Sequence, residues 1–346
     1  MTYADLLLEW YQENKRDLPW RRTKDPYCIW VSEIMLQQTQ VATVIPYYYA
    51  FLDRFPSVKD LANASLEEVH TYWQGLGYYR RGENLWRGAK LIVDKWGGRF
   101  PSDKELIKEI PGIGPYTLGA ISSIAFNIPL PAVDGNVMRI LSRQFCIEAD
   151  ISIAKNRRIF EDEVMELMPE HPSIFNQALM ELGALVCTPK NPKCSICPMK
   201  VLCEGYKTNS QEVYPIKAKK IKQVEEVYKV LVVKKGNRLG LVKRGSEGLL
   251  ANLWGFPMVK EEEWGRLGLD ERKGTGLNKI THIFTHRKWQ MYPVLLDWSK
   301  PLEEALIKNM KMEGKMQYVE IAHMGEFPIA TAYIKIIKAV TKKMKV

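Results

Sequence analysis

The hydrophobic positions of the first 205 residues follow a helical pattern. Apolar side chains recur at intervals of three and four residues, for example at Leu6, Leu7, Trp10 and Tyr11, and Pro, Gly, Asn and Ser separate the runs. Little of this part alternates in the way that a half-buried strand does. The pattern therefore predicts an all-helical region.

The pattern changes at a polar, Lys-rich stretch with one proline, residues 208–226, which we interpret as a linker. Residues 228–244 then predict two strands around a Lys-Gly-Asn-Arg turn, and residues 279–296 predict a later strand pair. Helical spacing returns at 327–343, where Pro328 suits a first helical turn. The expected fold is multidomain, with an all-α region followed by a smaller α+β domain.

Length and composition agree with this division. The chain has 346 residues, of which 46% are hydrophobic and 26% charged, and it has no low-complexity tract. No apolar run approaches the roughly 20 residues that a membrane span needs, and residues 1–10 lack the pattern of a signal peptide. We expect a cytoplasmic protein, in the cytosol or nucleoid of a bacterial cell, with no membrane partner.

The net charge of +10 is unevenly distributed. Residues 1–210 contain 24 basic and 25 acidic residues, a net charge of −1, while residues 211–346 contain 26 and 15, a net charge of +11. A basic surface favours a polyanionic partner, although a solvated Lys-rich exterior explains it equally well. If the first part binds nucleic acid, it must do so with placed groups rather than with excess charge.

Four of the six cysteines form a compact run with the spacing C-x6-C-x2-C-x5-C. They are Cys187, Cys194, Cys197 and Cys203. Four thiolates in so short a loop can surround a zinc ion or an iron-sulfur cube. The unequal gaps differ from the paired C-x2-C knuckles of zinc ribbons, so we favour a 4Fe-4S cluster over zinc, with disulfides a distant third in a reducing compartment. Cys28 and Cys146 are typical of buried small hydrophobic residues.

A glycine-rich turn joins two predicted helices in LIKEIPGIGPYTLGA, residues 106–120. Gly112 and Gly114 permit positive φ and a close backbone approach, and the helix that follows begins with unpaired N–H groups. Such a helix end can bind phosphate without lysine. Taken alone, a Gly-x-Gly turn is usually only a turn.

Two carboxylates are candidates for acid and base chemistry. Asp134 precedes Gly-Asn, where an aspartate is most often a turn residue or helix cap. Glu33 lies in an apolar run and shares a helix face with Ile29 and Leu36, so apolar surroundings should raise its pKa. Glu33 would then be a general acid while Asp134 stays ionised, the pairing that glycosidic cleavage requires. The sequence does not show whether residues 101 positions apart meet.

The cysteine run at the end of a helical region resembles the iron-sulfur loop of the helix-hairpin-helix DNA glycosylases, the group that contains endonuclease III and MutY. Within this group the chain resembles the MutY family of adenine DNA glycosylases over essentially its whole length. The matching segments are RDLPWR (16–21), SEIMLQQTQV (32–41), GLGYYRR (75–81), IPGIGPYT (110–117) and VDGNVMR (133–139).

This resemblance implies domain limits. They are a helical catalytic region at 1–207, with a six-helix-barrel part at about 20–125 and a cluster part formed by 1–19 plus 126–207, a linker at 208–226, and a Nudix-like domain at 227–346.

The resemblance also implies a mechanism. Glu33 would protonate adenine at N7, and Asp134 would stabilise the sugar oxocarbenium ion or trap it covalently before water completes the hydrolysis. Asn136 and Tyr116 would orient the carboxylate of Asp134. Tyr116 stands where bifunctional relatives carry a lysine, and a phenol cannot form a Schiff base. We therefore expect a monofunctional glycosylase that leaves an abasic site.

Other positions match family residues that contact DNA. Arg21 would lie near the adenine pocket, and the hairpin glycines Gly112 and Gly114 would approach the DNA backbone. Further residues would insert into the duplex or touch the strand with 8-oxoguanine once the adenine is flipped out. They are Gln37, Gln38, Thr39, Leu76 and Tyr78.

The C-terminal domain resembles Nudix hydrolases, and in this family it helps to recognise 8-oxoguanine. An ungapped overlay of the Nudix signature matches Glu261, Gly276 and Leu277. Lys273 and Gly274, however, stand where two magnesium-binding glutamates belong. Because lysine and glycine cannot hold Mg²⁺, we expect no nucleotide hydrolysis.

A short loop of this domain, Phe284, Thr285 and His286, resembles the family's Phe-Ser-His loop that reads 8-oxoguanine. Thr285 replaces serine, and its hydroxyl can still bond the edge of a purine. Without the family context, His286 would be an ordinary surface histidine.

The preferred hypothesis is a base excision repair enzyme that removes adenine opposite 8-oxoguanine or G from double-stranded DNA, acts as a monomer and carries a 4Fe-4S cluster. One alternative is an endonuclease III-like glycosylase and lyase for oxidised pyrimidines, against which Tyr116 and the extra domain argue. Another is a catalytically silent DNA-binding protein, which would not need both Glu33 and Asp134.

Overall fold

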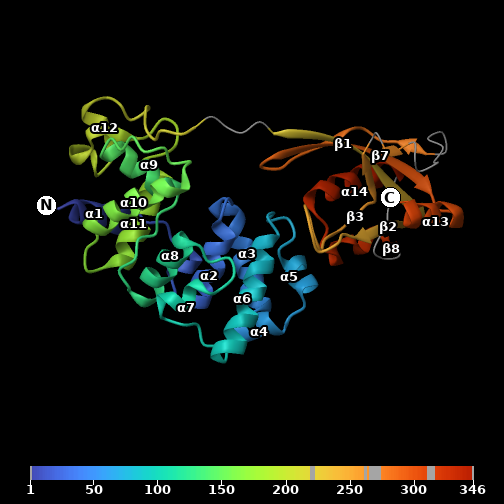
Figure 1. The fold of residues 1–346 in the computed structure, drawn as a ribbon, viewed down its shortest axis with the longest axis horizontal. Coiled ribbons are helices and arrows are strands. Elements are labelled where there is room, and N and C mark those ends of the chain that lie inside the picture. Colours follow the sequence, from blue (N-terminus) through green and yellow to red (C-terminus); the bar gives the residue numbers. More distant parts are fainter. Residues whose placement is uncertain (1, 219–222, 261–262, 265–273, 310–315, 345–346) are drawn as a thin grey trace. The chain divides into compact units, whose positions relative to one another are not determined.

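The computed structural model describes residues 2–218, 223–260, 263–264, 274–309 and 316–344. Internal contacts divide the chain into two compact units. The helical unit comprises Met1–Asn63 and Asn84–Lys219, and the sheet unit comprises Ala64–Glu83 and Lys220–Val346. The first unit is built of helices and the second adds helices to a mixed sheet, which confirms the predicted fold class (Figure 1).

Helices account for the regular structure of the helical unit. They are α1 (Tyr3–Asn14), α2 (Pro26–Leu36), α3 (Val41–Arg54), α4 (Val58–Asn63), most of α6 (Arg80–Trp96), α7 (Lys104–Lys108), α8 (Pro115–Phe126), α9 (Gly135–Gln144), α10 (Arg157–Leu167), α11 (Pro172–Leu185) and α12 (Glu204–Lys207). Short 3-10 turns lie between them: η1 (Pro19–Arg21), η2 (Ala154–Asn156), η3 (Cys194–Ile196) and η4 (Lys200–Leu202).

Two helices form the centre of the unit because they are apolar on all sides. Eight of the eleven residues of α2 are buried, and eight consecutive residues of α8, Thr117–Ile124, are buried as well. Each helix has proline in its first turn, where the missing N–H costs no hydrogen bond. On α8, Gly119 lies so close to the backbone that an added Cβ would be 2.0 Å from the carbonyl oxygen of Pro131.

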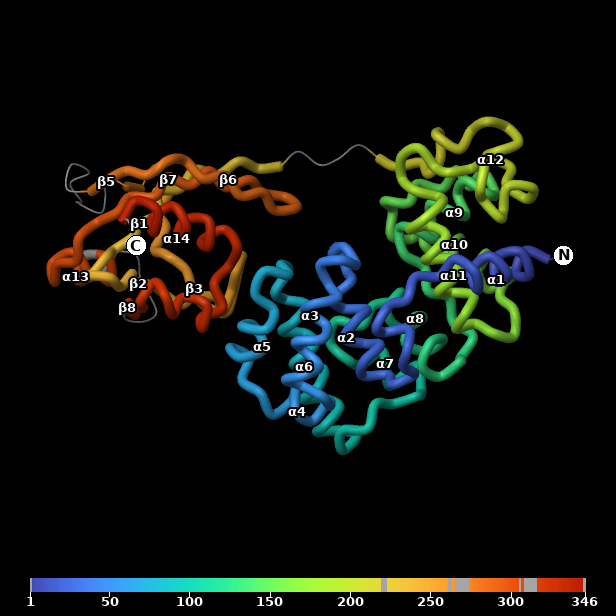
Figure 2. Tube along the Cα trace, turned by 180° about the vertical axis from the view of Figure 1, so that it is seen from behind, coloured from blue at the N-terminus to red at the C-terminus, as the bar shows by residue number. Residues whose placement is uncertain are grey.

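A second core joins the N-terminal helix to the later part of the unit. Figures 1 and 2 show α1 lying beside α10 and α11, far from its neighbours in the sequence. Leu7 and Tyr11 of α1 are buried there together with apolar residues of α9, α10 and α11. The N-terminal helix therefore packs onto the region just before the cysteine run.

In its described residues the sheet unit contains eight strands and three complete helices. The strands are β1 (Val224–Lys235), β2 (Arg238–Lys243), β3 (Trp254–Gly255), β4 (Met258–Lys260), β5 (Thr275–Gly276), β6 (Ile280–Ile283), β7 (Arg287–Asp297) and β8 (Gln317–Glu320). The helices are α5 (Leu66–Tyr72), α13 (Lys300–Asn309) and α14 (Thr331–Met344), and a 3-10 segment η7 covers Ile321–Glu326.

The long strands β1 and β7 are parallel neighbours in the middle of the sheet. They pair without interruption from Val224 with Arg287 to Lys234 with Asp297. The order is β3-β2-β1-β7-β5, with β4 paired to β1, β6 to β7 and β8 to β2. The antiparallel pairs β1/β2 and β6/β7 confirm the two strand pairs predicted from the sequence.

The structure differs from the sequence-based boundaries in two places. The stretch predicted as a linker, 208–226, is partly structured: the backbone carbonyls of Tyr214 and Ile216 accept hydrogen bonds from the helical unit, and β1 already begins at Val224. Residues 64–83, predicted to belong to the barrel part, group with the sheet unit because Glu67 accepts hydrogen bonds from Trp254 and Lys243.

Two further expectations concern single residues. Pro328 precedes α14 by three residues and does not lie in its first turn. Its carbonyl instead accepts a hydrogen bond from the backbone N–H of Trp254 in β3. In the Nudix overlay, Gly274 and Gly276 are described, whereas Glu261 and Lys273 lie outside the described residues.

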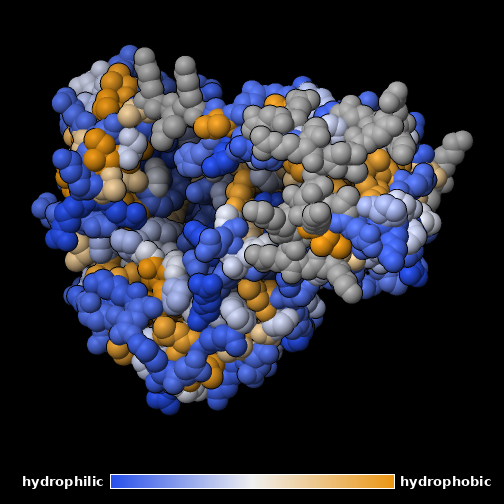
Figure 3. Space-filling model, turned by 45° about the vertical axis from the view of Figure 1, so that its right-hand side comes forward, coloured by the Kyte–Doolittle hydropathy of each residue, from blue (hydrophilic) through white to orange (hydrophobic). Residues whose placement is uncertain are grey.

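Hydrophilic side chains cover most of the face seen in Figure 3, and hydrophobic ones form small groups between them. Within the described residues, every helix is too short or too polar to traverse a lipid bilayer.

Candidate active site

Glu33 lies on the buried helix α2, and only 5% of the residue is exposed. The phenol of Tyr116 on α8 donates a hydrogen bond of 2.7 Å to its Oε2 atom. Burial raises the pKa of Glu33 to about 7, although the hydrogen bond from Tyr116 and the charge of Arg21 both lower it. Ile29 and Leu36 line the same cavity as Glu33, as their shared helix face predicts. A carboxyl group with this pKa can hold a proton near neutral pH.

Asp134 is the N-cap of α9, so the helix-cap interpretation of its sequence position is correct. Its Oδ1 atom accepts hydrogen bonds of 2.9 Å from the backbone N–H groups of Asn136 and Val137. Its Oδ2 atom accepts a hydrogen bond of 2.7 Å from the side-chain amide of Asn136. Three donors therefore fix the orientation of this carboxylate.

In the described residues Tyr116 shares no hydrogen bond with Asp134, the carboxylate that we expected it to orient. The only hydrogen bonds of the phenol in the described part of the chain go to Glu33 and, at 3.5 Å, to the sulfur of Met180. Tyr116 lies in the first turn of α8, and this helix packs against α2, which contains Glu33. Asp134, in contrast, lies at the start of α9. Burial and the nearby Glu33 carboxylate raise the pKa of Tyr116 well above its usual value, so the phenol keeps its proton.

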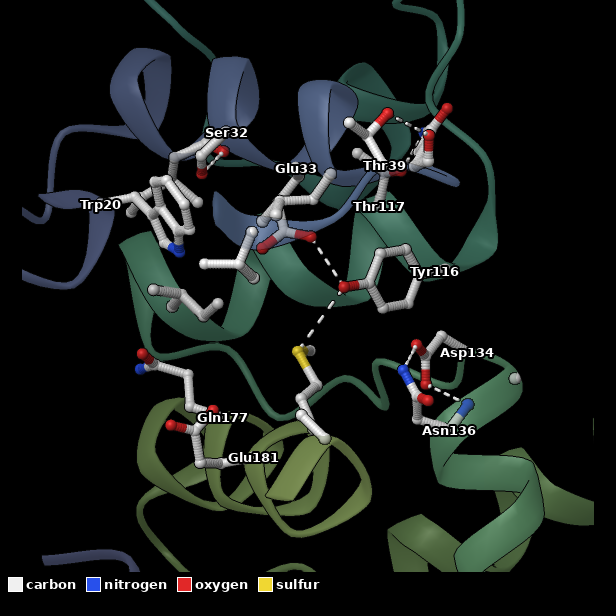
Figure 4. A pocket seen from close by; sticks show the side chains of 18 of the residues that line it. Trp20, Ser32, Glu33, Thr39, Tyr116, Thr117, Asp134, Asn136, Gln177 and Glu181 are labelled. Carbon is white, nitrogen blue, oxygen red and sulfur yellow. Dashed lines mark hydrogen bonds between the residues drawn. The ribbon is translucent and has the colours of Figure 1, made fainter. Parts of the chain in front are cut away.

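Glu33 and Asp134 line one cavity of about 630 Å³. Figure 4 shows Glu33 and Tyr116 pointing toward each other from α2 and α8, with Asp134 and Asn136 at the start of α9 beside them. The sequence-predicted residues that line this cavity are Arg21, Glu33, Gln37, Gln38, Thr39, Gly112, Gly114, Tyr116, Asp134 and Asn136. The structure thus brings together the acids that the sequence could not place relative to each other.

One part of the cavity was not predicted. Glu181 of α11 lies in the wall, and its side chain is 1% exposed. Its carboxylate accepts hydrogen bonds of 2.7–3.0 Å from the guanidinium groups of Arg16 and Arg21. Although burial raises the pKa of Glu181, these hydrogen bonds outweigh it and lower the pKa to about 2. Glu181 therefore remains ionised and holds Arg21 at the cavity.

The glycine turn lies at the cavity edge. Gly112 has φ +83, and an added Cβ would be 2.9 Å from the Cβ of Asn84. Gly114 is the N-cap of α8, and no side chain caps this helix. On the neighbouring segment, Gln38 has a left-handed φ of +56, and the amide of Gln37 donates a 3.4 Å hydrogen bond to the hydroxyl of Thr117.

The remaining predicted contact residues belong to the sheet unit and do not line this cavity. Leu76 is buried, whereas half of Tyr78 is exposed. The hydroxyl of Tyr78 lies 3.2 Å from the hydroxyl of Thr285, so these two predicted residues meet within the unit. Phe284, Thr285 and His286 form the turn between β6 and β7.

The four clustered cysteines lie in one loop with two 3-10 turns, and all are partly buried. In the described residues no group of His, Cys, Asp or Glu side chains is arranged to hold a metal ion. The buried guanidinium of Arg143 lies 3.4 Å from the sulfur of Cys187, and the sulfur of Cys203 lies 3.6 Å from the Arg143 carbonyl. A sulfur-only donor set beside a buried cation fits an anionic iron-sulfur cluster, as it would also fit a four-thiolate zinc site.

The cysteine loop is also connected to Asp134. Arg139 of α9 donates hydrogen bonds to the carbonyl of Cys187 at 2.8 Å and to the side-chain oxygen of Asn136 at 3.0 Å. The amide of Asn136 in turn donates to Asp134. Only two side chains therefore separate a cysteine of the loop from the carboxylate in the cavity.

Comparison with known proteins decides the family. Adenine DNA glycosylase of Mus musculus is 38% identical over 86% of this chain and 71% of its own length. Adenine DNA glycosylase of Buchnera aphidicola (strain Sg) is 36% identical over 86% of this chain and 88% of its own length. The chain belongs to the adenine DNA glycosylase family.

Each part of this adenine DNA glycosylase family member matches a known domain. Residues 31–170 match the HhH-GPD superfamily of base excision DNA repair proteins, residues 187–203 match the iron-sulfur binding domain of endonuclease III, and residues 229–339 match the Nudix domain. The structure of a thermostable thymine-DNA glycosylase is similar over 60% of this chain and 95% of its own, with a TM-score of 0.56 and 30% identity. Cys187, Cys194, Cys197 and Cys203 thus form the iron-sulfur binding loop of a DNA glycosylase.

Proposed function

We propose that this enzyme removes adenine paired with 8-oxoguanine or G in double-stranded DNA by hydrolysing the N-glycosidic bond. The observation that carries the proposal is the pair of unlike carboxyl groups in one cavity. Glu33 is buried with a pKa of about 7, and Asp134 is fixed by three hydrogen-bond donors. Separated environments of two carboxyl groups are what acid-assisted glycosidic cleavage uses.

In the proposed reaction the protonated Glu33 gives its proton to N7 of the flipped adenine. The bond between C1′ and N9 then breaks and its electron pair leaves with the neutral base. The carboxylate of Asp134 stabilises the oxocarbenium ion on the sugar, either through space or as a transient covalent ester. Water adds to C1′ and its proton returns to Glu33, which restores the enzyme.

The phenol of Tyr116 supports this cycle by donating to Glu33, which limits how far burial raises its pKa. Because Tyr116 has no amine, it forms no imine with the sugar, and the product is an abasic site in an uncut strand. The iron-sulfur cluster, when bound by the four cysteines, would shape the loop that meets the DNA backbone. Arg139 transmits the position of that loop to Asn136 and Asp134.

The sheet unit supplies the proposed recognition of 8-oxoguanine. The hydroxyls of Tyr78 and Thr285 lie side by side at the exposed end of the β6/β7 hairpin, where they could bond the edge of the oxidised purine. By resemblance to the family, each of Gln38, Thr39, Leu76 and Tyr78 would insert into the duplex or touch the strand with 8-oxoguanine. We further propose that the enzyme is a monomer of the cytosol or nucleoid and that its Nudix-like domain does not hydrolyse nucleotides.

The test is a single-turnover assay with duplexes that contain A opposite 8-oxoguanine, A opposite G, or an oxidised thymine. Alkali should reveal abasic sites only in the two adenine duplexes, and no strand should break without alkali. Breakage without alkali, or activity on oxidised thymine alone, would support the alternative lyase. Absence of product from every duplex would support a silent DNA-binding protein.

The variant Glu33→Gln tests the assigned acid. Glutamine keeps the size of the side chain but has no proton to give, so excision should fall by at least 100-fold while duplex binding changes little. Glu9→Gln makes the same change at an exposed position of α1 and serves as the control. Near-normal excision by Glu33→Gln would refute the role.

A further inference from the structure

The turn that carries Thr285 is backed by a stack of four aromatic rings. The ring of His282 packs on Phe284 at 4.6 Å between centroids, Phe284 on Trp289 at 4.8 Å, and Trp289 on Tyr228 at 5.3 Å. All three contacts have the edge-to-face geometry that aromatic pairs prefer. Phe284 is therefore held from both sides, while Thr285 and His286 at the tip are exposed.

A single carboxylate fixes the middle of this stack. The indole N–H of Trp289 donates a 2.9 Å hydrogen bond to Oε2 of Glu226, and the guanidinium of Arg287 donates to Oε1. Trp289 is 3% exposed, and the side chain of Glu226 is 15% exposed. Glu226 and Trp289 are directly paired residues of the parallel strands β1 and β7, so the strands themselves set the hydrogen bond.

The backbone of the turn is held independently. The backbone N–H of Phe284 donates to the carbonyl of Arg287 at 2.7 Å, and the N–H of Val224 donates to the carbonyl of His286 at 3.0 Å. The side-chain amide of Gln223 donates to the carbonyl of Phe284 at 3.0 Å. The main chain is thus fixed at both ends, and the aromatic stack is what remains to fix the side chain of Phe284.

We infer that Glu226 and Trp289 are positioning residues for 8-oxoguanine discrimination, which they support without touching DNA. The inference rests on the proposed function. Glu226 holds the indole, and the indole holds the ring of Phe284, which is itself a predicted contact residue. The hydroxyl of the adjacent Thr285 lies 3.2 Å from that of Tyr78. A recognition turn whose side chains are already fixed loses less conformational freedom when it binds the lesion. The affinity for 8-oxoguanine then rises relative to that for G.

The test compares Glu226→Gln with Glu225→Gln. Both remove one negative charge from neighbouring residues of β1, but Glu225 points to the opposite face, where it pairs with Lys288 at 3.4 Å and is 45% exposed. In Glu226→Gln the amide can accept from only one of its two donors, and its own N–H₂ group faces the other. The readout is the ratio of excision rates for A opposite 8-oxoguanine and A opposite G, measured at enzyme concentrations below saturation.

We expect Glu226→Gln to lower this ratio about tenfold, as loss of one charge-assisted hydrogen bond would, with the rate on A opposite G changed less than about twofold on the same grounds. Glu225→Gln should keep the wild-type ratio. Trp289→Phe retains a ring against Phe284 but has no N–H donor, so it should lower the ratio similarly. The double variant Glu226→Gln/Trp289→Phe should lower the ratio no further than either single variant, because both substitutions remove the same hydrogen bond.

The outcomes separate this inference from the function on which it rests. Equal wild-type rates on the two duplexes would overturn the proposed recognition of 8-oxoguanine by the sheet unit, and the positioning role with it, but not the excision of adenine. A wild-type preference that persists in both Glu226→Gln and Trp289→Phe would overturn the positioning role alone. A parallel fall on both duplexes would also overturn it, because a merely structural residue would lower both rates together.

Discussion

Tyr116→Phe should shift the pH dependence of excision toward higher pH. Protonated Glu33 is the reactive form, so the rate should fall as the pH rises through the pKa of Glu33, about 7. The phenol of Tyr116 donates to the carboxylate at 2.7 Å and so favours the ionised form. Removal of this donor favours the protonated form and raises the pKa of Glu33.

The size of the shift follows from the hydrogen bond. A hydrogen bond to a charged group contributes about 1.5 kcal/mol, and one pKa unit corresponds to about 1.4 kcal/mol. The alkaline limb of the profile should therefore move up by about one pH unit, from near 7 toward 8. The maximal rate can fall at the same time without changing this expectation, because the position of the limb does not depend on its height.

The assay is single-turnover excision from a duplex with A opposite 8-oxoguanine, at enzyme concentrations below saturation and at closely spaced pH values. Under these conditions the profile reports groups of the free enzyme. Tyr49→Phe removes the same hydroxyl from an exposed residue of α3 and should leave the limb unmoved. A limb that stays in place or moves to lower pH in Tyr116→Phe would refute the assignment of Glu33 as the titrating acid.

Three other changes test the rest of the structure. Glu33→Gln should stabilise the fold at alkaline pH. Because the pKa of Glu33 is about 7 in the native state and ordinarily 4.5, the free energy of unfolding of the wild type falls by up to about 3 kcal/mol as the pH rises between these values. Melting curves at low and high pH will show whether the variant lacks this loss of stability. Arg139→Gln should slow excision at least tenfold with iron content retained, because Asn136 loses its support; an unchanged rate would count against the connection. Gly119→Ala should destabilise the helical unit by about 1–3 kcal/mol, because the added Cβ would collide with the Pro131 carbonyl. An unaltered melting temperature would contradict that packing.

Much of the fold follows from local pattern. The three- and four-residue spacing predicts the helices. Short apolar runs, in the first case around a Lys-Gly-Asn-Arg turn, predict the hairpins β1/β2 and β6/β7. The burial of Glu33 follows in the same way, because its helix face contains Ile29 and Leu36. Each of these features depends on residues within about ten positions of one another.

The features that the sequence did not predict depend on contacts between distant residues. Parallel pairing of β1 and β7 joins residues more than 60 positions apart, and nothing in either strand specifies its partner. The grouping of residues 64–83 with the sheet unit depends on hydrogen bonds from Lys243 and Trp254 to Glu67. Periodicity predicts which face of an element is buried but not which other element covers it.

Glu33 and Glu181 illustrate what this limit means for chemistry. Both are carboxylates in apolar helices that line the same cavity, so the rule that burial raises a carboxyl pKa would treat them alike. The pKa of Glu33 rises to about 7 because a neutral phenol is its only hydrogen-bond donor within the described residues, whereas that of Glu181 falls to about 2 because two guanidinium groups outweigh burial. Those guanidinium groups belong to Arg16 and Arg21, at least 160 positions away in the chain. Which of two buried acids carries a proton is therefore decided by tertiary contacts, and a proton donor can be assigned only after its distant partners are known.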